Sequence, residues 1–131
     1  MSAMSDYLEA RIHNHILNAV ASAAPASVYV ALYTAAPSDS GGGTEVSGNN
    51  YSRAQMTAGW TVNATSGVAQ NTAQVEFPVA SGSWGTVTHI GIFDAASGGN
   101  LLYHGALNSS IAVVADDKPV FAAGDLTITL A

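Results

Sequence analysis

The sequence lacks cysteine and has few charged residues, and each shortage excludes a class of protein. With no thiol among its 131 residues, the chain cannot form a disulfide framework, a cysteine zinc site or an iron–sulfur cluster. Charged residues make up 9% of the chain, well below the roughly one quarter found in an average domain. We therefore expect a surface that is polar but largely uncharged.

Basic residues are particularly scarce. Arg11, Arg53 and Lys118 stand against nine acidic residues, which gives a formal net charge of -6 at pH 7. Proteins that bind nucleic acids neutralise phosphates with clustered Lys and Arg, so we expect no nucleic-acid partner. We expect no membrane partner either.

Long apolar runs are missing as well. Every apolar run is far shorter than the roughly 20 residues that cross a bilayer, so we expect no membrane span. The first residues carry no basic stretch ahead of an apolar one, and His13, Asn14 and His15 interrupt the apolar residues that follow. We therefore expect no export signal and synthesis in the cytoplasm of the producing cell.

The pattern at the start of the chain predicts a single helix over residues 5–20. Ser5 or Asp6 is the expected N-cap, and Asp6 with Glu9 resembles a capping box. Apolar residues then recur at every fourth position, which makes one apolar stripe that should pack on another element. The residues of this stripe are Leu8, Ile12, Ile16 and Val20, with Leu17 beside them.

The remainder, residues 27–131, reads as a β-domain. Residues 27–34 alternate with apolar side chains on both faces, which is typical of a central strand. Residues 35–50 are rich in Gly, Pro and Asn and predict a long loop. Period-two patterns then follow at short spacing, at residues 51–56, 60–64, 68–70, 72–77, 86–93, 101–107, 111–114, 120–122 and 126–130.

These patterns predict one mainly β domain spanning residues 1–131. Eight to ten short strands with one N-terminal helix indicate a β-sandwich or a jelly-roll-like small barrel. The clearest hairpin signal is the segment from Asp94 to Asn100. In residues 84–107 we expect Ile90, Ile92, Leu101 and Tyr103 to contribute to the core or its margin, with Asp94 and Asn100 shaping the turn.

Candidate chemical residues are few. His13 and His15 are two apart on the expected helix and point in nearly opposite directions, so they cannot chelate one ion. His89 and His104 flank the 94–100 hairpin and would face each other in one strand register, as a metal or acid–base pair. Hydrogen-bonded strand histidines are the interpretation we favour.

Two further motifs are incomplete. The segment Gly82–Gly85 lacks the Gly-x-Ser-x-Gly spacing of a hydrolase nucleophile, so we interpret it as a turn with Trp84 as a core or interface anchor. Asp116, Asp117 and Asp125 lack a calcium-loop pattern and are interpreted as turn residues. We expect no catalytic residues, no cofactor and no metal.

Eight segments of the chain form a recognisable series: 7–9, 16–18, 28–34, 43–48, 51–53, 84–94, 98–105 and 123–128. Together they resemble a family of small virion proteins of tailed bacteriophages that are labelled tail-fibre-like. The resemblance covers nearly the whole chain.

The resemblance implies a non-enzymatic structural protein of the virion, synthesised in the host bacterial cytoplasm. It would be a capsid decoration or cement protein, or a tail-attached module, that packs against major capsid or tail proteins. A low-charge surface rich in Ser, Thr and Asn loses its hydration at little cost, which suits permanent packing. We expect a homotrimer from this class of protein.

We expect the N-terminal helix and the 35–50 loop to be docking arms. The residues assigned to an interface are Tyr7, Ile12, Ile16, Tyr51, Arg53, Trp60 and Trp84. The alternative is a glycan-binding module for host adhesion at the tail tip, because aromatic faces stack on sugars. The aromatic residues available for a host surface glycan are Tyr7, Tyr29, Tyr33, Tyr51, Trp60 and Tyr103.

Overall fold

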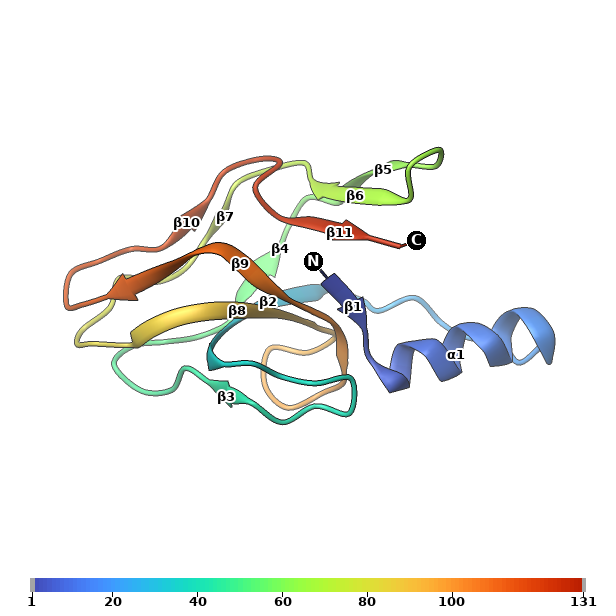
Figure 1. The fold of residues 1–131 in the computed structure, drawn as a ribbon, viewed down its shortest axis with the longest axis horizontal. Coiled ribbons are helices and arrows are strands. Elements are labelled where there is room, and N and C mark those ends of the chain that lie inside the picture. The colour runs from blue at the N-terminus through green and yellow to red at the C-terminus, as the bar shows by residue number, and fades with distance from the viewer. Residues whose placement is uncertain (1, 131) are drawn as a thin grey trace.

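The computed structural model describes residues 2–130 and is mainly β, with one helix near the N-terminus (Figure 1). The helix is α1 (Asp6–Leu17). The strands are β1 (Ser2–Met4), β2 (Val28–Ala35), β3 (Thr44–Glu45), β4 (Ala54–Met56), β5 (Trp60–Asn63), β6 (Val68–Asn71), β7 (Val75–Glu76), β8 (Gly85–Phe93), β9 (Leu101–Val113), β10 (Val120–Phe121) and β11 (Thr127–Thr129).

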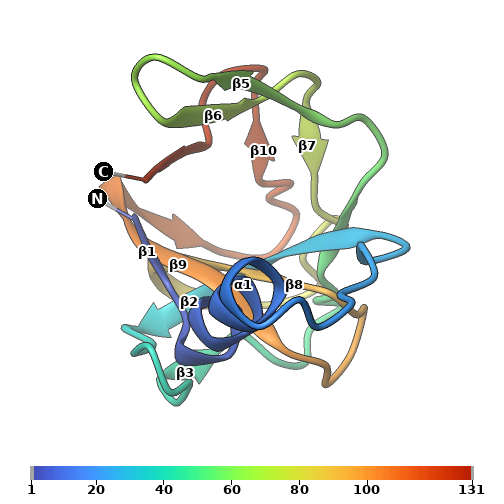
Figure 2. The ribbon, with the colours of Figure 1, turned by 90° about the vertical axis from the view of Figure 1, so that its right-hand side faces the viewer.

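The strands form three antiparallel sheets. The largest has the order β1-β9-β8-β2-β3, and β4 also pairs with β2. The two small sheets, β10-β7 and β11-β6-β5, lie over one face of the large sheet (Figure 2). The mainly β class with an N-terminal helix is thus confirmed, although the strands between residues 2 and 130 do not close into a barrel.

The main core lies between the large sheet and the small sheets. Val30 and Leu32 of β2 and Ile92 of β8 contribute from the large sheet, while Phe121 and Ile128 contribute from the small ones. Each of these side chains is at most 7% exposed. The core therefore joins segments far apart in the chain, and burial of its apolar surface stabilises all three sheets together.

Strand β2 confirms the predicted central strand at residues 27–34. It pairs with β8 on one side and with β3 and β4 on the other. Ala31 and Tyr33 point away from the main core into a smaller cluster with Phe93 and Leu101. Both faces of the strand are therefore covered, as its two-sided apolar pattern indicated.

Helix α1 begins where the sequence predicted, because Ser5 is its N-cap and its Oγ accepts a hydrogen bond from Leu8 N–H at 3.2 Å. The helix ends at Leu17, three residues before the predicted end. Ala19 has a φ of 53°, and the N–H of Val20 bonds back to the Asn14 carbonyl at 3.0 Å. This left-handed turn stops the helix before the last residue of the apolar stripe.

Most of the apolar stripe of α1 does not pack within the chain. None of the residues Asp6–Leu17 is buried, and Ile16 is 69% exposed. Figure 1 shows the physical reason: the helix touches β9 near its start and then extends away from the sheets. Leu8 alone in the stripe is half-buried.

The predicted 35–50 loop is long, as expected, but it folds back on β2 through β3. A bridge between Ser38 and Gly41 tightens its tip. Gly43 has a φ of +73°, and a Cβ there would lie 2.7 Å from the backbone nitrogen of Pro37. Glycine is therefore required at this point for the return of the chain.

Strand β9 is longer than predicted. The sequence indicated separate strands at 101–107 and 111–114, but β9 runs unbroken from Leu101 to Val113. Its pairing with β8 shifts between the pairs Val87–Ile111 and His89–Ala106. Residues 107–110 of β9, which lie between these pairs, therefore form a bulge. Strands 51–56 and 72–77 are, in contrast, shorter than predicted.

The 94–100 hairpin turn is confirmed. The Asn100 N–H donates to Asp94 Oδ1 at 2.7 Å, and its Nδ2 donates to Oδ2 at 3.0 Å. Ile92 and Leu101 are buried beside the turn, and Ile90 and Tyr103 are half-buried against the main core.

Candidate functional site

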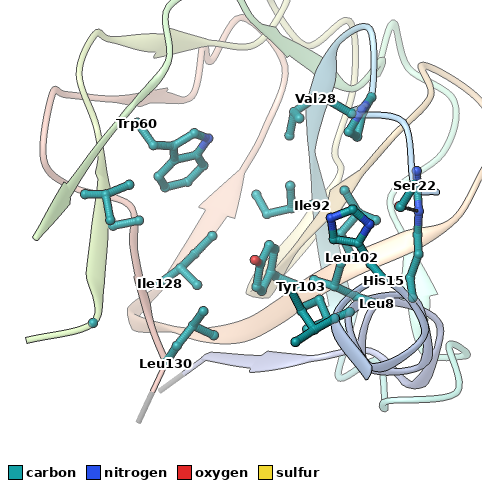
Figure 3. A pocket seen from close by; sticks show the side chains of 18 of the residues that line it. Leu8, His15, Ser22, Val28, Trp60, Ile92, Leu102, Tyr103, Ile128 and Leu130 are labelled. Carbon is teal, nitrogen blue, oxygen red and sulfur yellow. Dashed lines mark hydrogen bonds between the residues drawn. The ribbon is translucent and has the colours of Figure 1, made fainter. Parts of the chain in front are cut away.

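The surface carries an apolar groove of about 640 Å³ between α1 and the sheet β11-β6-β5. Figure 3 shows Trp60, Ile128 and Leu130 on one side of it, facing Leu8 and His15 on the other. Ile92 and Tyr103 of the large sheet form its floor. Further lining residues are Arg11, Ile12, Ile16, Ser22, Ala23, Ala24, Pro25, Val28, Val62, Asn63, Ala64, Gly67, Ala69 and Leu102.

Helix α1 forms the first wall with its apolar stripe. Ile12 is 39% exposed and Ile16 is 69% exposed, although both line the groove. Arg11 holds this wall in place: its Nε donates to Ser22 Oγ at 2.6 Å, and its Nη2 donates to the Ala23 carbonyl. The helix is therefore tied to the segment that follows it, while its apolar side chains stay uncovered.

The sheet β11-β6-β5 forms the second wall. The alternation of β5 turns Trp60 and Val62 to the same face, and β11 adds Ile128 beside them. Val62 is 67% exposed and Leu130 is 43% exposed. Two apolar walls thus face each other across a groove that neither of them fills.

The chemistry of the groove is sparse. Of the described residues that line it, none is Asp or Glu, and those that titrate are Arg11, His15 and Tyr103. Burial raises the pKa of the Tyr103 hydroxyl above its usual value. A concave apolar surface with so few polar groups suits the packing of another apolar surface.

The structure brings three of the seven predicted interface residues together. Ile12, Ile16 and Trp60 all line the groove. Tyr7 lies on α1 outside the groove, 39% exposed, and its hydroxyl accepts a hydrogen bond from Arg11 Nη1 at 3.2 Å. The assignment of these residues to an interface stays a prediction.

Tyr51 and Trp84, also assigned to the interface, lie instead within the fold. Trp84 is 5% exposed, and its Nε1 donates to the Asn49 carbonyl at 2.9 Å. The ring of Tyr51 meets the Trp84 ring edge-on, with 5.3 Å between centroids. Both aromatic residues therefore anchor the end of the 35–50 loop to the core rather than presenting a free surface.

Arg53 is held inside the fold by its partners. Its guanidinium binds Glu45 through Nε at 2.9 Å and Nη2 at 2.8 Å, and it lies 3.6 Å from the centre of the Phe93 ring. Nη1 donates to the carbonyls of Ala95 and Gly98 in the hairpin turn. The hydrogen bond to Glu45 raises the pKa of Arg53.

Tyr51 completes this network. Its hydroxyl donates to Glu45 Oε2 at 2.8 Å and accepts the N–H of Leu32 at 3.0 Å. Burial raises the pKa of Tyr51, and the neighbouring Glu45 carboxylate acts in the same direction. Glu45, Tyr51 and Arg53 therefore join β3, β2 and the hairpin turn through one neutralised cluster.

The two strand histidines do not pair with each other. In the observed register His89 lies opposite Ala106, and His104 lies opposite Gly91. His104 Nε2 is 2.7 Å from Asp39 Oδ1, whereas His89 Nδ1 is 2.8 Å from the hydroxyl of Thr88. Within residues 2–130, no three His, Asp or Glu side chains gather as metal ligands would.

The acidic turn residues bond to the backbone near them. Asp117 Oδ2 accepts the Val114 N–H at 3.0 Å, and Asp125 Oδ2 accepts the Ala122 N–H at 2.9 Å. These are turn-forming contacts of the kind the sequence indicated.

The aromatic residues weighed for glycan binding do not share a face. Tyr33 is 4% exposed in the smaller core cluster, and Tyr51 is held in the Glu45 network. Trp60 and Tyr103 line the groove. A stacking platform in the groove would be formed by these last two.

Sequence reasoning missed much of the second wall. Val62 and Leu130 were assigned to strands but not to a site. The alternation that puts Trp60 and Val62 on one face was available as a signal. The sequence held no signal for the proximity of Leu130 to α1, because that proximity depends on how the sheets stack.

The fold and the groove define a class: a small, mainly β structural module with an uncovered apolar groove. The chain belongs to the family described as podophage GP4 fiber I protein gp80, whose model matches residues 3–129. It is therefore a phage tail-fibre-like structural protein and a virion component. A search of curated proteins finds no match. In the described part of the chain, no helix has the length and apolar character of a membrane span.

Proposed function

We propose that this chain is a non-enzymatic, tail-attached module of the virion that acts by packing its groove against protein. The observation that carries the proposal is the pair of facing apolar walls, with Ile16 69% and Val62 67% exposed. Exposed apolar patches of this kind mark protein interfaces. Covering them removes apolar area from water at about 25 cal/mol per Å².

The groove chemistry supports a non-enzymatic role. Catalysis by acid–base chemistry needs titratable groups that converge on one point. The groove offers Arg11, whose guanidinium is bound to Ser22 and Ala23, and His15, whose Nδ1 is 3.1 Å from the Val20 carbonyl. Neither faces a carboxylate among the groove residues described.

The family match favours the tail over the capsid as the place of attachment, because its description is that of a fibre protein. Capsid decoration and glycan adhesion are the other outcomes of the test. Host adhesion would use Trp60 and Tyr103, which line the groove.

The test uses particles that lack this protein and purified chain added back. Val62→Glu places a charge on the groove wall at an exposed position, so we expect it to fold normally and to attach about tenfold more weakly or worse. Val79→Glu is the matched control, because Val79 is 46% exposed and lies outside the groove. Equal attachment of both variants would contradict the proposal. Binding to a glycan array, lost in Val62→Glu, would favour adhesion.

A further inference from the structure

A polar hollow of about 590 Å³ lies on the face of the large sheet opposite the main core. Its walls come from three segments: the start of α1, the tip of the 35–50 loop and the 94–100 hairpin turn. Figures 1 and 2 show these segments gathered below the large sheet, on the side away from the two small sheets. Of the described residues, none lines both this hollow and the apolar groove. Its volume is in the range of small-ligand sites, about 300–1,000 Å³.

Tyr33 lines the polar hollow with a hydroxyl that has no partner in the fold. The residue is 4% exposed and clusters with Phe93 and Leu101. Its hydroxyl makes no hydrogen bond within residues 2–130, although no side-chain oxygen or nitrogen in that range is both fully buried and unpaired. The hydroxyl is therefore open to the hollow that Tyr33 lines. Polar groups so nearly buried are normally hydrogen-bonded, so this one points to a ligand.

The charges around the hollow exclude an anionic ligand. Arg53 is the basic residue of the described lining, and its donors are already bound: Nε and Nη2 to Glu45, and Nη1 to two carbonyls of the hairpin turn. Asp6 and Asp39 add two carboxylates, held near each other by a 2.9 Å hydrogen bond from Asp6 N–H to the Asp39 carbonyl. A phosphate, sulfate or carboxylate group would therefore meet like charge there.

The lining offers both hydrogen-bond acceptors and donors. Asp6 and Asp39 supply carboxylate oxygens, and the N–H groups of Gly42 and Gly98 donate no hydrogen bond within the described chain. Burial, and then the charge of Glu45, raises the pKa of Tyr33, so its hydroxyl keeps its proton at neutral pH and can both donate and accept. A cation would only donate, whereas a sugar hydroxyl does both.

Tyr7 adds an aromatic ring at the edge of the hollow. It is 39% exposed, and its hydroxyl accepts a hydrogen bond from Arg11 Nη1 at 3.2 Å, which holds the ring in position. The apolar face of a sugar stacks on aromatic rings. The hollow thus combines one accessible ring with hydrogen-bonding groups of both kinds.

We propose that the polar hollow binds an uncharged saccharide. The Tyr7 ring stacks on one sugar ring, while the Tyr33 hydroxyl and the Asp39 carboxylate bind sugar hydroxyls. This inference goes beyond the proposed function and does not rest on it, because the groove and the hollow are separate. It also places sugar binding away from Trp60 and Tyr103. The molecule then has one surface for protein and another for saccharide.

The first test is a glycan array probed with the full chain, displayed in many copies on beads so that weak binding is detected. The array carries uncharged oligosaccharides and acidic ones that contain uronic acids. We expect binding to uncharged oligosaccharides that persists in about 0.5 M NaCl, because no ion pair is involved. An array on which no uncharged oligosaccharide is bound would overturn the inference. So would competition by arginine amide that disappears at high salt, which is the behaviour of a cation site.

The second test is Tyr33→Phe, measured by calorimetric titration with the oligosaccharide bound most strongly on the array. Because the hydroxyl makes no hydrogen bond within residues 2–130, the melting temperature should stay the same or rise. The affinity should fall about fivefold or more. Tyr29→Phe is the matched control: it removes a hydroxyl from the same face of β2 but outside the hollow, and should bind like the wild type. Equal affinities of Tyr33→Phe and the wild type would contradict the assignment.

The third test concerns the ring of Tyr7. Tyr7→Leu removes the stacking surface and should weaken binding about threefold or more, whereas Tyr7→Phe keeps the ring and should bind nearly as well as the wild type. Equal weakening in both variants would show that the ring does not stack on the sugar.

Val62→Glu separates the hollow from the groove. We expect this variant to keep its affinity for the oligosaccharide, whatever its attachment to particles. Sugar binding that is lost in Val62→Glu and kept in Tyr33→Phe would place the saccharide in the groove and overturn the inference. Sugar binding through the hollow, together with equal particle attachment of Val62→Glu and Val79→Glu, would contradict the proposed function alone.

Discussion

Single side chains in this protein hold together segments that are distant in the sequence. Tyr51 is the clearest example, because its one hydroxyl serves both the backbone of β2 and the Glu45 carboxylate. Glu45 in turn binds Arg53, which reaches the hairpin turn through Ala95. Removing one hydroxyl therefore affects three segments at once.

We expect Tyr51→Phe to lower the free energy of unfolding by about 1–3 kcal/mol, because it leaves the Leu32 N–H without its partner. Chemical denaturation measures this directly. Tyr29→Phe, which removes a hydroxyl from β2, is the control and should change stability by less than about 0.5 kcal/mol. Similar losses in both variants would contradict the role of the network.

Tyr51 also predicts a loss of stability in base. Its folded pKa is raised above the unfolded value of about 10, so its contribution is present below that pH and is lost as the pH rises further. Thermal melts at increasing pH above 10 should therefore fall more steeply for the wild type than for Tyr51→Phe. Parallel curves would contradict this assignment.

Asp94 predicts a loss of stability in acid. The N–H and side-chain amide of Asn100 hold the pKa of the Asp94 carboxyl below its usual value of 3.8. A lowered folded pKa stabilises the protein above the unfolded value, and that contribution disappears as the pH falls through the folded value. Asp94→Asn should flatten the fall in melting temperature between about pH 4 and pH 2. An equally steep fall in Asp94→Asn and the wild type would contradict this assignment.

At the scale of elements, the position of α1 depends on its N-cap residue, Ser5, more than on its apolar stripe. Ser5 is buried, caps the helix and donates its hydroxyl to the Leu101 carbonyl. The same residue thus starts the helix and attaches it to β9.

We expect Ser5→Ala to lower the free energy of unfolding by about 0.5–2 kcal/mol, as the loss of a helix cap does elsewhere. The helix signal at 222 nm should weaken before the sheet unfolds. Ser40→Ala, in the exposed loop tip, is the control. An unchanged helix signal in Ser5→Ala would show that the cap is dispensable.

An element was predictable from the sequence when the interactions that form it act between residues close together in the chain. The strand at β2 and the cap at Ser5 were predictable because periodicity and capping act between near neighbours. The 101–113 strand was divided in error because Asn108–Ser110 has the composition of a turn. Its continuity comes from pairing with β8, which the local sequence does not encode.

The site was harder to predict than the fold. Ile12, Ile16 and Trp60 were assigned to an interface and do line the groove, but the wall formed by Val62 and Leu130 depends on the stacking of sheets. Arg53 was assigned to the interface, but its side chain is held inside the fold. Its burial depends on Glu45 and on Phe93, forty residues farther along the chain, whose proximity only the folded topology provides.

At the scale of the whole molecule, low charge and an apolar groove predict how attachment to the particle responds to salt. The packing of apolar walls against protein is not screened by ions, and the chain has few charged residues to form ion pairs with a partner. Raising NaCl from about 0.05 to 0.5 M should therefore leave attachment to particles unchanged or strengthen it. Attachment of the purified chain at both salt concentrations measures this, and clear loss at high salt would contradict an apolar interface.

The anchoring of α1 at one end also has a mechanical consequence. The helix is fixed where Ser5 bonds to β9 and where Asp6 N–H bonds to the Asp39 carbonyl, while its far end extends beyond the sheets. It is a helix of 12 residues that is attached to the sheets at one end only. A pull on its tip would become a torque at Ser5. The load then enters the molecule through β9, the longest strand of the large sheet.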